Sequence, residues 1–204
     1  MEEIVSGLNV SRETYDSLRF YETLARKWTR KINLVSPSTV SDLWRRHIVD
    51  SAQVFHVKQN PGAIWLDIGS GAGFPGLVCA VLAKELSPAT EFHLIESDQR
   101  KCAFLRTVKR ELGLKATIWA QRIEAVETIN ANVVSARALA DLDTLLSFAD
   151  HHMAESGVAL FQKGETWEKE VEAAKEKWRF TLNPHKSKTS SNSTILEIGG
   201  IERV

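Results

Sequence analysis

The stretch LDIGSGAGFPG, residues 66–76, restricts the fold of this chain more than any other part of the sequence. An apolar run ends in Asp67, four glycines follow at positions 69, 71, 73 and 76, and a helical pattern begins directly afterwards. Glycine has no Cβ, so such a loop can turn tightly and let a ligand approach the backbone. Pro75 suits the first turn of the helix, where its missing N–H group is not needed. A strand, a glycine turn and a helix N-terminus in this order are typical of a site for an adenosyl cofactor.

Two acidic residues near the loop distinguish between the possible cofactors. Gly71, Gly73 and Gly76 fit the G-x-G-x-x-G spacing of dinucleotide sites only loosely. Asp67 would repel a pyrophosphate, whereas a carboxylate there suits the sulfonium and amino groups of S-adenosylmethionine. Glu96 ends the next apolar run, at a strand end where a carboxylate can accept hydrogen bonds from ribose hydroxyls. We therefore predict an S-adenosylmethionine site; the alternative is a plain glycine-rich turn in another α/β protein.

The composition of the chain predicts one domain with a small N-terminal extension. It has 204 residues, of which 43% are hydrophobic, enough for a core, and 26 Lys and Arg balance 26 Asp and Glu. A contact with RNA must therefore use a local patch of charge, because no global field attracts the chain to it. Cys79 and Cys102 lie in apolar helical patterns, which predicts buried thiols and no metal site. No signal peptide or membrane span is recognisable, so we expect a cytoplasmic, monomeric protein without a membrane partner.

The order of predicted elements indicates an α/β fold. Helices over 11–33 and 39–57 form an N-terminal helical extension, which we place at residues 1–60. From residue 61 to 204, strands and helices alternate, which favours a parallel sheet covered on both faces. The predicted strands are 63–68, 91–96, 116–120, 131–136 and 157–163, and the predicted helices are 75–86, 98–112, 141–153 and 165–177.

The end of the chain departs from this alternation. Strands are predicted at 178–182 and 194–198 with a polar loop and no helix between them, so this pair forms an antiparallel hairpin. A mostly parallel sheet that ends in a reversed hairpin is typical of the Rossmann-like class I S-adenosylmethionine-dependent methyltransferases.

Six short blocks of the sequence narrow this prediction further. Together they closely resemble the bacterial small-subunit (16S) ribosomal RNA guanine-N7 methyltransferases, the family also called glucose-inhibited division protein B. The resemblance spans roughly residues 20 to 165, and the Phe-Pro-Gly ending of the glycine loop is unusual among other methyltransferases. The blocks are RHIVDS at 46–51, GSGAGFPG at 69–76, QRKCAFLR at 99–106, QRIE at 121–124, SARA at 135–138 and FQKG at 161–164.

The resemblance implies where the cofactor contacts lie. In such proteins they fall in the glycine loop, in the loop after the third strand and on the arginine that ends the fourth strand. These positions join the acidic residues and glycines argued above, and the full set expected to bind the cofactor is Asp67, Gly69, Gly71, Gly73, Phe74, Glu96, Ile123, Glu124 and Arg137.

The resemblance also implies the substrate, a guanine of 16S rRNA that is methylated at nitrogen 7, either in free rRNA or in the small ribosomal subunit. Nitrogen 7 has a lone pair and carries no proton, so we predict an enzyme that positions its reactants and uses no residue as general acid or base. Arg137 and His47 are the candidates for this positioning. The residues expected to face the RNA are Arg46, His47, Arg122 and Lys163.

Each of these basic residues also has a structural interpretation. His47 can be a packed histidine that bonds Asp50, three residues further along the helix. Arg137 can form an ion pair with Asp141 or Glu124. Arg122 can pair with a surface carboxylate, and Lys163 can simply be solvated.

Three other functions stay open on the residues alone. A methyltransferase for small molecules or proteins would use the same cofactor site, and the zero net charge favours it. An NAD-dependent oxidoreductase would use Glu96 for the ribose, although Asp67 argues against it. A cofactor-free RNA-binding module would leave the glycine loop without a purpose.

Overall fold

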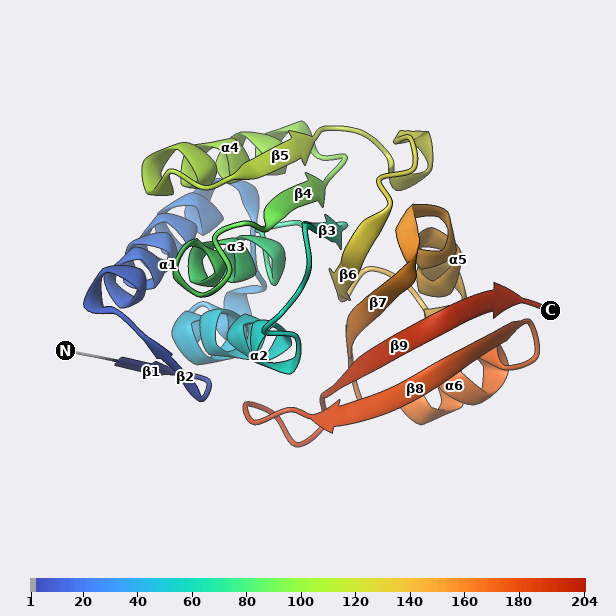
Figure 1. The fold of residues 1–204 in the computed structure, drawn as a ribbon. Coiled ribbons are helices and arrows are strands. Elements are labelled where there is room, and N and C mark those ends of the chain that lie inside the picture. The colour runs from blue at the N-terminus through green and yellow to red at the C-terminus, as the bar shows by residue number, and fades with distance from the viewer. Residues whose placement is uncertain (1–2) are drawn as a thin grey trace.

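The structure is a computed structural model that describes residues 3–204, and its centre is a single twisted sheet (Figure 1). Its seven strands are β3 (Ile64–Ile68), β4 (Glu91–Ile95), β5 (Ala116–Trp119), β6 (Ala131–Arg137), β7 (Met153–Lys163), β8 (Trp178–Lys186) and β9 (Thr194–Arg203).

The strand order across the sheet is β5-β4-β3-β6-β7-β9-β8. Strands β3 to β7 are mutually parallel, whereas β9 is antiparallel to both β7 and β8. The predicted mostly parallel sheet with an antiparallel C-terminal hairpin is therefore confirmed. Each predicted strand of the parallel part matches an observed strand, although β7 begins four residues earlier than expected.

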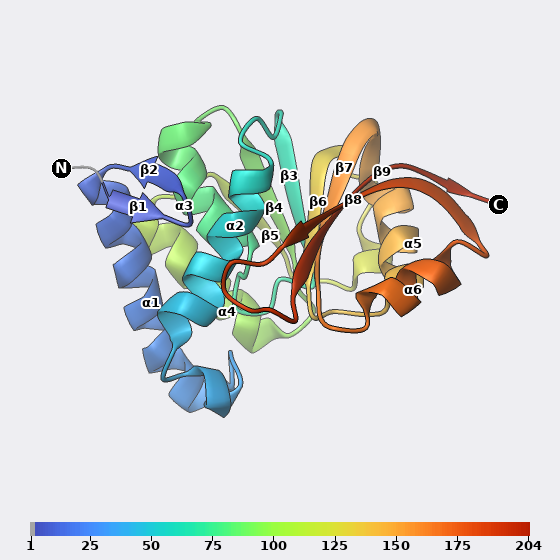
Figure 2. The same ribbon diagram turned by 90° about the horizontal axis from the view of Figure 1, so that it is seen from below.

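Helices cover both faces of the sheet (Figure 2). Neighbouring residues of β3 point to opposite faces, so Trp65 packs in one hydrophobic core and Leu66 in the other. The core that contains Trp65 includes side chains of four helices, and the core that contains Leu66 includes side chains of two. On the four-helix face, the first helix packs on the outside of the third and fourth. The first group is α1 (Arg12–Ile32), α2 (Asp50–Val57), α3 (Gly76–Leu86) and α4 (Gln99–Leu112), and the second is α5 (Leu142–His152) and α6 (Trp167–Ala174).

The N-terminal region contains both the best and the worst prediction of local structure. Helix α1 matches its prediction: the Ser11 side chain accepts a hydrogen bond from the Thr14 N–H group at its start, and Asn33 ends it with φ 49°. The single helix predicted over 39–57 is wrong, because a 3-10 turn at Pro37–Thr39 precedes a π-helical segment at Trp44–Val49 that leads into α2. A wider π-helical turn often marks a functional site.

A small hairpin at the start of the described chain was not predicted. Strands β1 (Glu3–Val5) and β2 (Leu8–Val10) pair with each other and are separate from the central sheet. Each has only three residues, which is too short for an alternating pattern to stand out from chance.

The topology gathers several loops at one edge of the sheet. The parallel strands β3, β4, β6 and β7 all end at this carboxyl edge. The chain adds strands β4 and β5 on one side of β3 and then β6 and β7 on the other, so the direction of winding reverses at β3. The glycine loop joins β3 to α3 there, and open α/β sheets bind their ligands at such a point. Among residues 3–204, no helix is both long enough and apolar enough to cross a membrane.

Candidate active site

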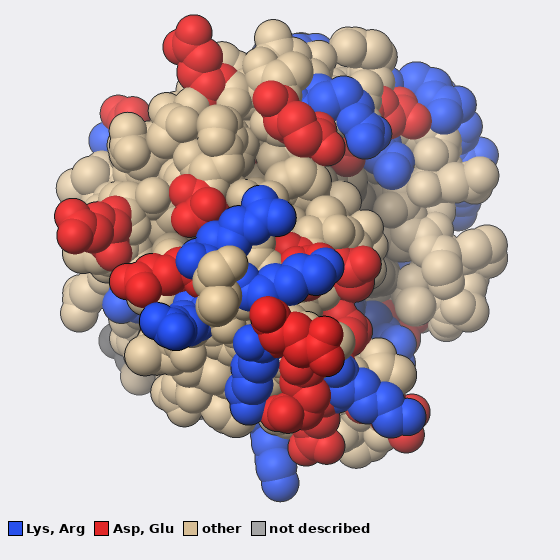
Figure 3. All heavy atoms as spheres, turned by 90° about the vertical axis from the view of Figure 1, so that its right-hand side faces the viewer, with Lys and Arg blue, Asp and Glu red and all other residues tan. Residues whose placement is uncertain are grey.

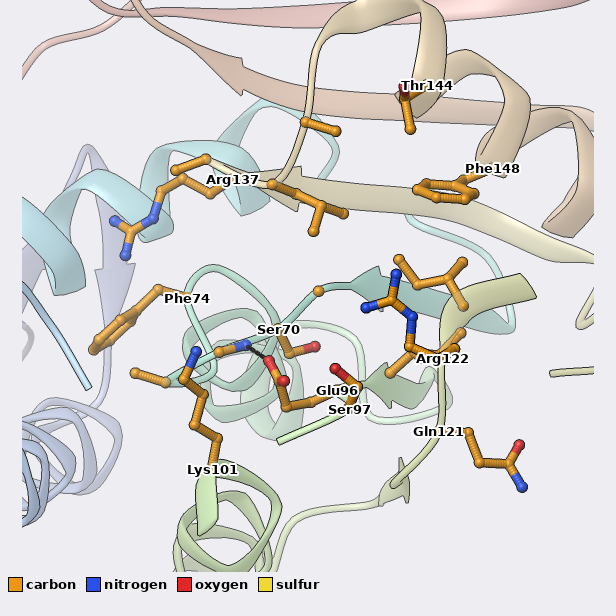
Figure 4. A pocket seen from close by; sticks show the side chains of 18 of the residues that line it. Ser70, Phe74, Glu96, Ser97, Lys101, Gln121, Arg122, Arg137, Thr144 and Phe148 are labelled. Atoms are coloured by element: carbon orange, nitrogen blue, oxygen red, sulfur yellow. Dashed lines mark hydrogen bonds between the residues drawn. The ribbon is translucent and has the colours of Figure 1, made fainter. Parts of the chain in front are cut away.

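A cavity of about 570 Å³ opens at the carboxyl edge of the sheet. The glycine loop, the ends of β4 and β6, the segment after β5 and helix α5 line it. Figure 4 shows Phe74, Glu96, Arg122 and Arg137 around this hollow, while the side chain of Gln121 points away from it. Parts of the chain far apart in sequence thus form one site.

Glu96 is held in a fixed orientation at the floor of the cavity. One carboxylate oxygen accepts the Gly71 N–H group and the other accepts the Asp98 N–H group, both at 2.8 Å. Each carboxylate oxygen can accept a second hydrogen bond. Glu96 lines the cavity and is 8% exposed, so its acceptors suit the paired hydroxyls of a ribose. The residues present therefore fit the adenosyl part of S-adenosylmethionine.

The glycine loop is anchored from below by helix α1. The Tyr21 hydroxyl donates a hydrogen bond to the Ala72 carbonyl at 2.5 Å. Gly73 has φ +83°, and a Cβ there would lie 2.6 Å from the Tyr21 oxygen, so only glycine fits this close approach. Gly69 and Gly71 line the cavity, whereas Gly73 faces α1 beneath it.

Asp67 lies behind the glycine loop instead of in the cavity. Its side chain is 1% exposed, and the Ser135 hydroxyl donates to its Oδ1 at 2.6 Å. Its Oδ2 is buried and has no hydrogen-bond partner among the described residues. Burial raises the pKa of this carboxyl from 3.8 to about 6, more than its hydrogen bonds lower it. Asp67 is therefore buried behind the glycine loop and does not line the cavity itself.

Arg137 extends from the end of β6 to the N-terminal extension. Its Nη1 donates to the Arg46 carbonyl at 3.3 Å and lies 3.6 Å from Asp50 Oδ2. Its guanidinium also lies over the Phe74 ring, 5.1 Å from the ring centre. The expected structural partners of Arg137 were wrong. Asp141 instead caps α5, and Glu124 lies 3.9 Å from Arg122.

His47 is buried against the same arginine. Its ring stacks on Phe74 with centroids 5.0 Å apart, and its Nδ1 lies 2.8 Å from Arg137 Nη2. An arginine only donates, so Nδ1 accepts and the proton resides on Nε2, which donates to Thr39 Oγ1 at 2.9 Å. Burial lowers the pKa of His47 to about 3, helped by the charges of Arg137 and Arg46. The predicted hydrogen bond to Asp50 is wrong, because the π-helical turn directs the ring elsewhere.

The other expected site residues differ in how accessible they are. Ile123 and Glu124 line the cavity, as does Arg122, whose side chain is 76% exposed. Arg46 is exposed beside the cavity region. Lys163 is only 9% exposed, because it pairs with Glu170 at 2.5 Å and donates to the Ala140 carbonyl.

A second cavity of about 320 Å³ adjoins the first. Arg137 and Ala138 line both cavities, and Ala138 has φ +50°, a backbone conformation that is rare for alanine. Sequence reasoning assigned no site role to Asp50 and Gln162, which line this second cavity. Both belong to blocks of the family resemblance, the only signal by which they could have been found. Within residues 3–204, no group of three or more His, Cys, Asp or Glu side chains is placed to hold a metal ion.

The solved structures that are similar to this one have low sequence identity to it, so they support the fold alone. A SAM-dependent methyltransferase from Aquifex aeolicus has a TM-score of 0.61 at 12% identity, covering 89% of this chain and 97% of that one. TYW2 of M. jannaschii, in complex with AdoMet, has a TM-score of 0.57 at 15% identity, covering 76% of both chains. The predicted class I methyltransferase fold is confirmed.

Similarity in sequence is much closer. The family described as rRNA small subunit methyltransferase G matches residues 14–196. The ribosomal RNA small subunit methyltransferase G of Ruegeria sp. (strain TM1040) is 52% identical over 97% of this chain and 96% of its own length. That of Cereibacter sphaeroides (strain ATCC 17029) is 43% identical over 100% of this chain and 98% of its own. This chain belongs to the rRNA small subunit methyltransferase G family.

Proposed function

We propose that this chain transfers a methyl group from S-adenosylmethionine to nitrogen 7 of a guanine in 16S rRNA of the small ribosomal subunit. The observation that carries the proposal is the cavity at the carboxyl edge, with Glu96 oriented at its floor and Arg137 at its border. Family membership over residues 14–196 supports the rRNA substrate.

The residues that would hold the cofactor divide into those in the cavity and those behind it. Glu96 would accept the ribose hydroxyls, and the segment at 123–124 would border the adenine. Gly69, Gly71, Phe74 and Arg137 complete the wall. Asp67 and Gly73 would act indirectly, by supporting the loop. S-adenosylmethionine, when bound, supplies an electrophilic methyl group whose bonding pair leaves on sulfur.

The chain's own contribution would be to position the base and exclude water. Nitrogen 7 of guanine needs no deprotonation, and His47 has both ring nitrogens engaged, one with Arg137 and one with Thr39. A histidine with a pKa of about 3 is neutral at pH 7, so it would hold Arg137 in place without adding charge. Alignment of nucleophile, methyl carbon and sulfur is then the main source of rate enhancement.

The RNA would approach the carboxyl edge. Arg46 and Arg122 are exposed there and would contact phosphates, whereas His47 and Lys163 would act from buried positions in the wall. We place the reaction in the cytoplasm, where ribosomal subunits are assembled, and infer a monomer that needs no metal. Residues 1–60 would serve as an extension packed on a methyltransferase domain of residues 61–204.

The test is the transfer of labelled methyl from S-adenosylmethionine to small subunits purified from cells that lack this protein. Free rRNA and total metabolites are assayed in parallel. Label in the small-subunit rRNA that maps to 7-methylguanosine is the expected result. Label in metabolites or proteins, with none in RNA, would overturn the proposal while leaving the cofactor site in place.

A further inference from the structure

The second cavity is lined by several polar side chains that the proposed function does not use, beside Arg46, His47, Arg137 and Lys163, to which it gives a role. It lies between the end of β7 and the loop that joins β8 to β9, at residues 187–193. Arg137 and Ala138 line both cavities. A ligand bound in the second cavity would therefore be next to a ligand bound in the first at these two residues. The hydroxyl side chains that line it belong to Thr39, Ser187, Thr189, Ser190, Ser193 and Thr194.

Gln162 lines this cavity, and the hydrogen bonds of its amide group fix the orientation of the acceptor atom Oε1. Its Nε2 donates to Asp50 Oδ2 at 2.7 Å and to the Asp50 carbonyl at 3.3 Å. If the amide group of Gln162 were flipped, its oxygen Oε1 would face the two acceptor oxygens of Asp50 and would be repelled by them. The observed orientation is therefore the favourable one. Oε1 itself is buried and unpaired within the part of the chain that the structure describes. An unsatisfied buried acceptor favours a ligand that donates to it.

Asp50 keeps Gln162 in this orientation because it is itself held from several sides. Its carboxylate accepts hydrogen bonds from Thr189 Oγ1 at 2.5 Å and from Gln53 Nε2 at 3.1 Å, and it lies 3.6 Å from Arg137. Helix α2, strand β6, strand β7 and the loop of the C-terminal hairpin therefore converge on one side chain. The acceptor of Gln162 is oriented before any ligand arrives.

The chemistry of purines determines which base suits this arrangement. Nitrogen 7 and the Watson–Crick edge lie on neighbouring edges of a purine, so the N1–H bond of guanine points roughly at a right angle to the nitrogen 7 lone pair. Because the two cavities adjoin at Arg137 and Ala138, a base whose nitrogen 7 faces the first cavity can direct its Watson–Crick edge into the second. At N1 and C2 guanine donates through N1–H and the 2-amino group, whereas adenine has an acceptor at N1 and no 2-amino group and donates only from its 6-amino group, where guanine has a carbonyl. A site built to accept a hydrogen bond rejects an analogue that cannot donate it.

We propose that the second cavity is the pocket for the target base and that Gln162 selects guanine by accepting a hydrogen bond from its N1–H or 2-amino group. The inference rests on the proposed function, which requires an unstacked purine beside the cofactor. Gln162 is thus a specificity-determining residue, and Asp50 is the residue that positions it.

The test separates recognition of the base from methyl transfer. The probes are uridine oligoribonucleotides with a single central 7-deazaguanosine or 7-deazaadenosine, both of which lack the reacting nitrogen. Their affinities are measured by fluorescence anisotropy in the presence of S-adenosylhomocysteine. We expect the unsubstituted protein to prefer 7-deazaguanosine by about tenfold, the value of one discriminating hydrogen bond, and Gln162→Met to lose most of that preference.

The matched control is Gln59→Met, at an exposed position in the turn after α2 that lines neither cavity. It should keep the full preference, and thermal unfolding should show that both variants are folded. An unchanged preference in folded Gln162→Met would overturn the inference, as would equal binding of both probes and of an all-uridine oligomer. Methyl transfer to small subunits is measured separately, and its failure would refute the proposed function. If methyl transfer succeeds but Gln162→Met keeps the preference for 7-deazaguanosine, only the role of Gln162 is refuted.

Discussion

At the scale of single residues, the site depends on carboxylates whose surroundings differ sharply. Glu96 has both oxygens bonded to backbone N–H groups and still borders the cavity, whereas Asp67 is buried beneath the glycine loop with one oxygen unpaired among residues 3–204. The sequence pattern predicted both at the cofactor site but could not tell which of them lines the cavity. That difference depends on how closely α3 packs over β3, since a Cβ on Gly76 would lie 2.6 Å from the Asp67 side chain.

Removal of the Glu96 side chain is expected to weaken cofactor binding. Glu96→Ala removes the acceptors for the ribose and leaves the N–H groups of Gly71 and Asp98 without their partner. The dissociation constant for S-adenosylhomocysteine should rise about tenfold or more, as for the loss of charge-assisted hydrogen bonds. Isothermal titration calorimetry measures it, with Glu91→Ala, at the exposed start of the strand that Glu96 follows, as control. Equal affinities in both variants would contradict the assigned pocket.

Asp67 should make the stability of the fold depend on pH. Its folded pKa of about 6 exceeds the ordinary value of 3.8, so its contribution is fully present below pH 4 and is lost as pH rises through 6. Asp67→Asn does not titrate. Its free energy of unfolding, relative to the unsubstituted protein, should therefore rise by about 2 kcal/mol between pH 4 and pH 7. Urea denaturation at a series of pH values tests this, and parallel curves for the two proteins would refute it.

At the scale of elements, long periodic segments could be predicted and short or distant relationships could not. The strands of the parallel sheet and helices α3 to α6 lie near their predicted positions because burial on one or both faces imprints a pattern on many residues. The π-helical turn at Trp44–Val49 has an ordinary helical pattern, and only its packing reveals it. The convergence on Asp50 joins residues 112 and 139 positions apart, which no local pattern records.

The start of α1 provides a test at this scale. The Ser11 side chain accepts a hydrogen bond from the Thr14 N–H group, and Ser11→Ala leaves that group without its cap. The free energy of unfolding should fall by about 1 kcal/mol, which chemical denaturation can measure. Ser17→Ala is the control, because Ser17 is half-buried in the helix interior, its hydroxyl bonds only the Glu13 carbonyl of the same helix, and its replacement should change stability little. A cap contribution of zero would mean that Glu85, which also bonds Ser11, fixes the helix start alone.

At the scale of the whole molecule, the balance of charge limits how RNA can be bound. The chain has zero net charge, and the face at the right of Figure 1 carries acidic and basic side chains side by side (Figure 3). Under the proposed function, attraction to RNA would come from a few arginines around the carboxyl edge, and specificity would come from the cavities. Such a protein is expected to bind RNA in general weakly and its target well.

The dependence of RNA binding on salt should reveal these few contacts. Arg46→Gln and Arg122→Gln should each reduce the slope of log affinity against log salt concentration by about one. Affinity for small subunits, measured by filter binding over a range of KCl concentrations, gives that slope. Arg179→Gln, on the exposed face of β8, should leave it unchanged. Equal losses for all three substitutions would argue for diffuse attraction in place of local contacts.

The hydrogen-bonded chain behind the glycine loop also gives the molecule an optical reporter. The Trp65 indole donates to the Ser135 hydroxyl at 2.9 Å, and that hydroxyl donates to Asp67. The Trp65 indole is fully buried and stacks on the rings of Phe55 and Phe92. A change in the charge of Asp67 therefore changes the electrostatic environment of this indole. Near-ultraviolet signals from this rigid chromophore will register events beneath the loop without any label.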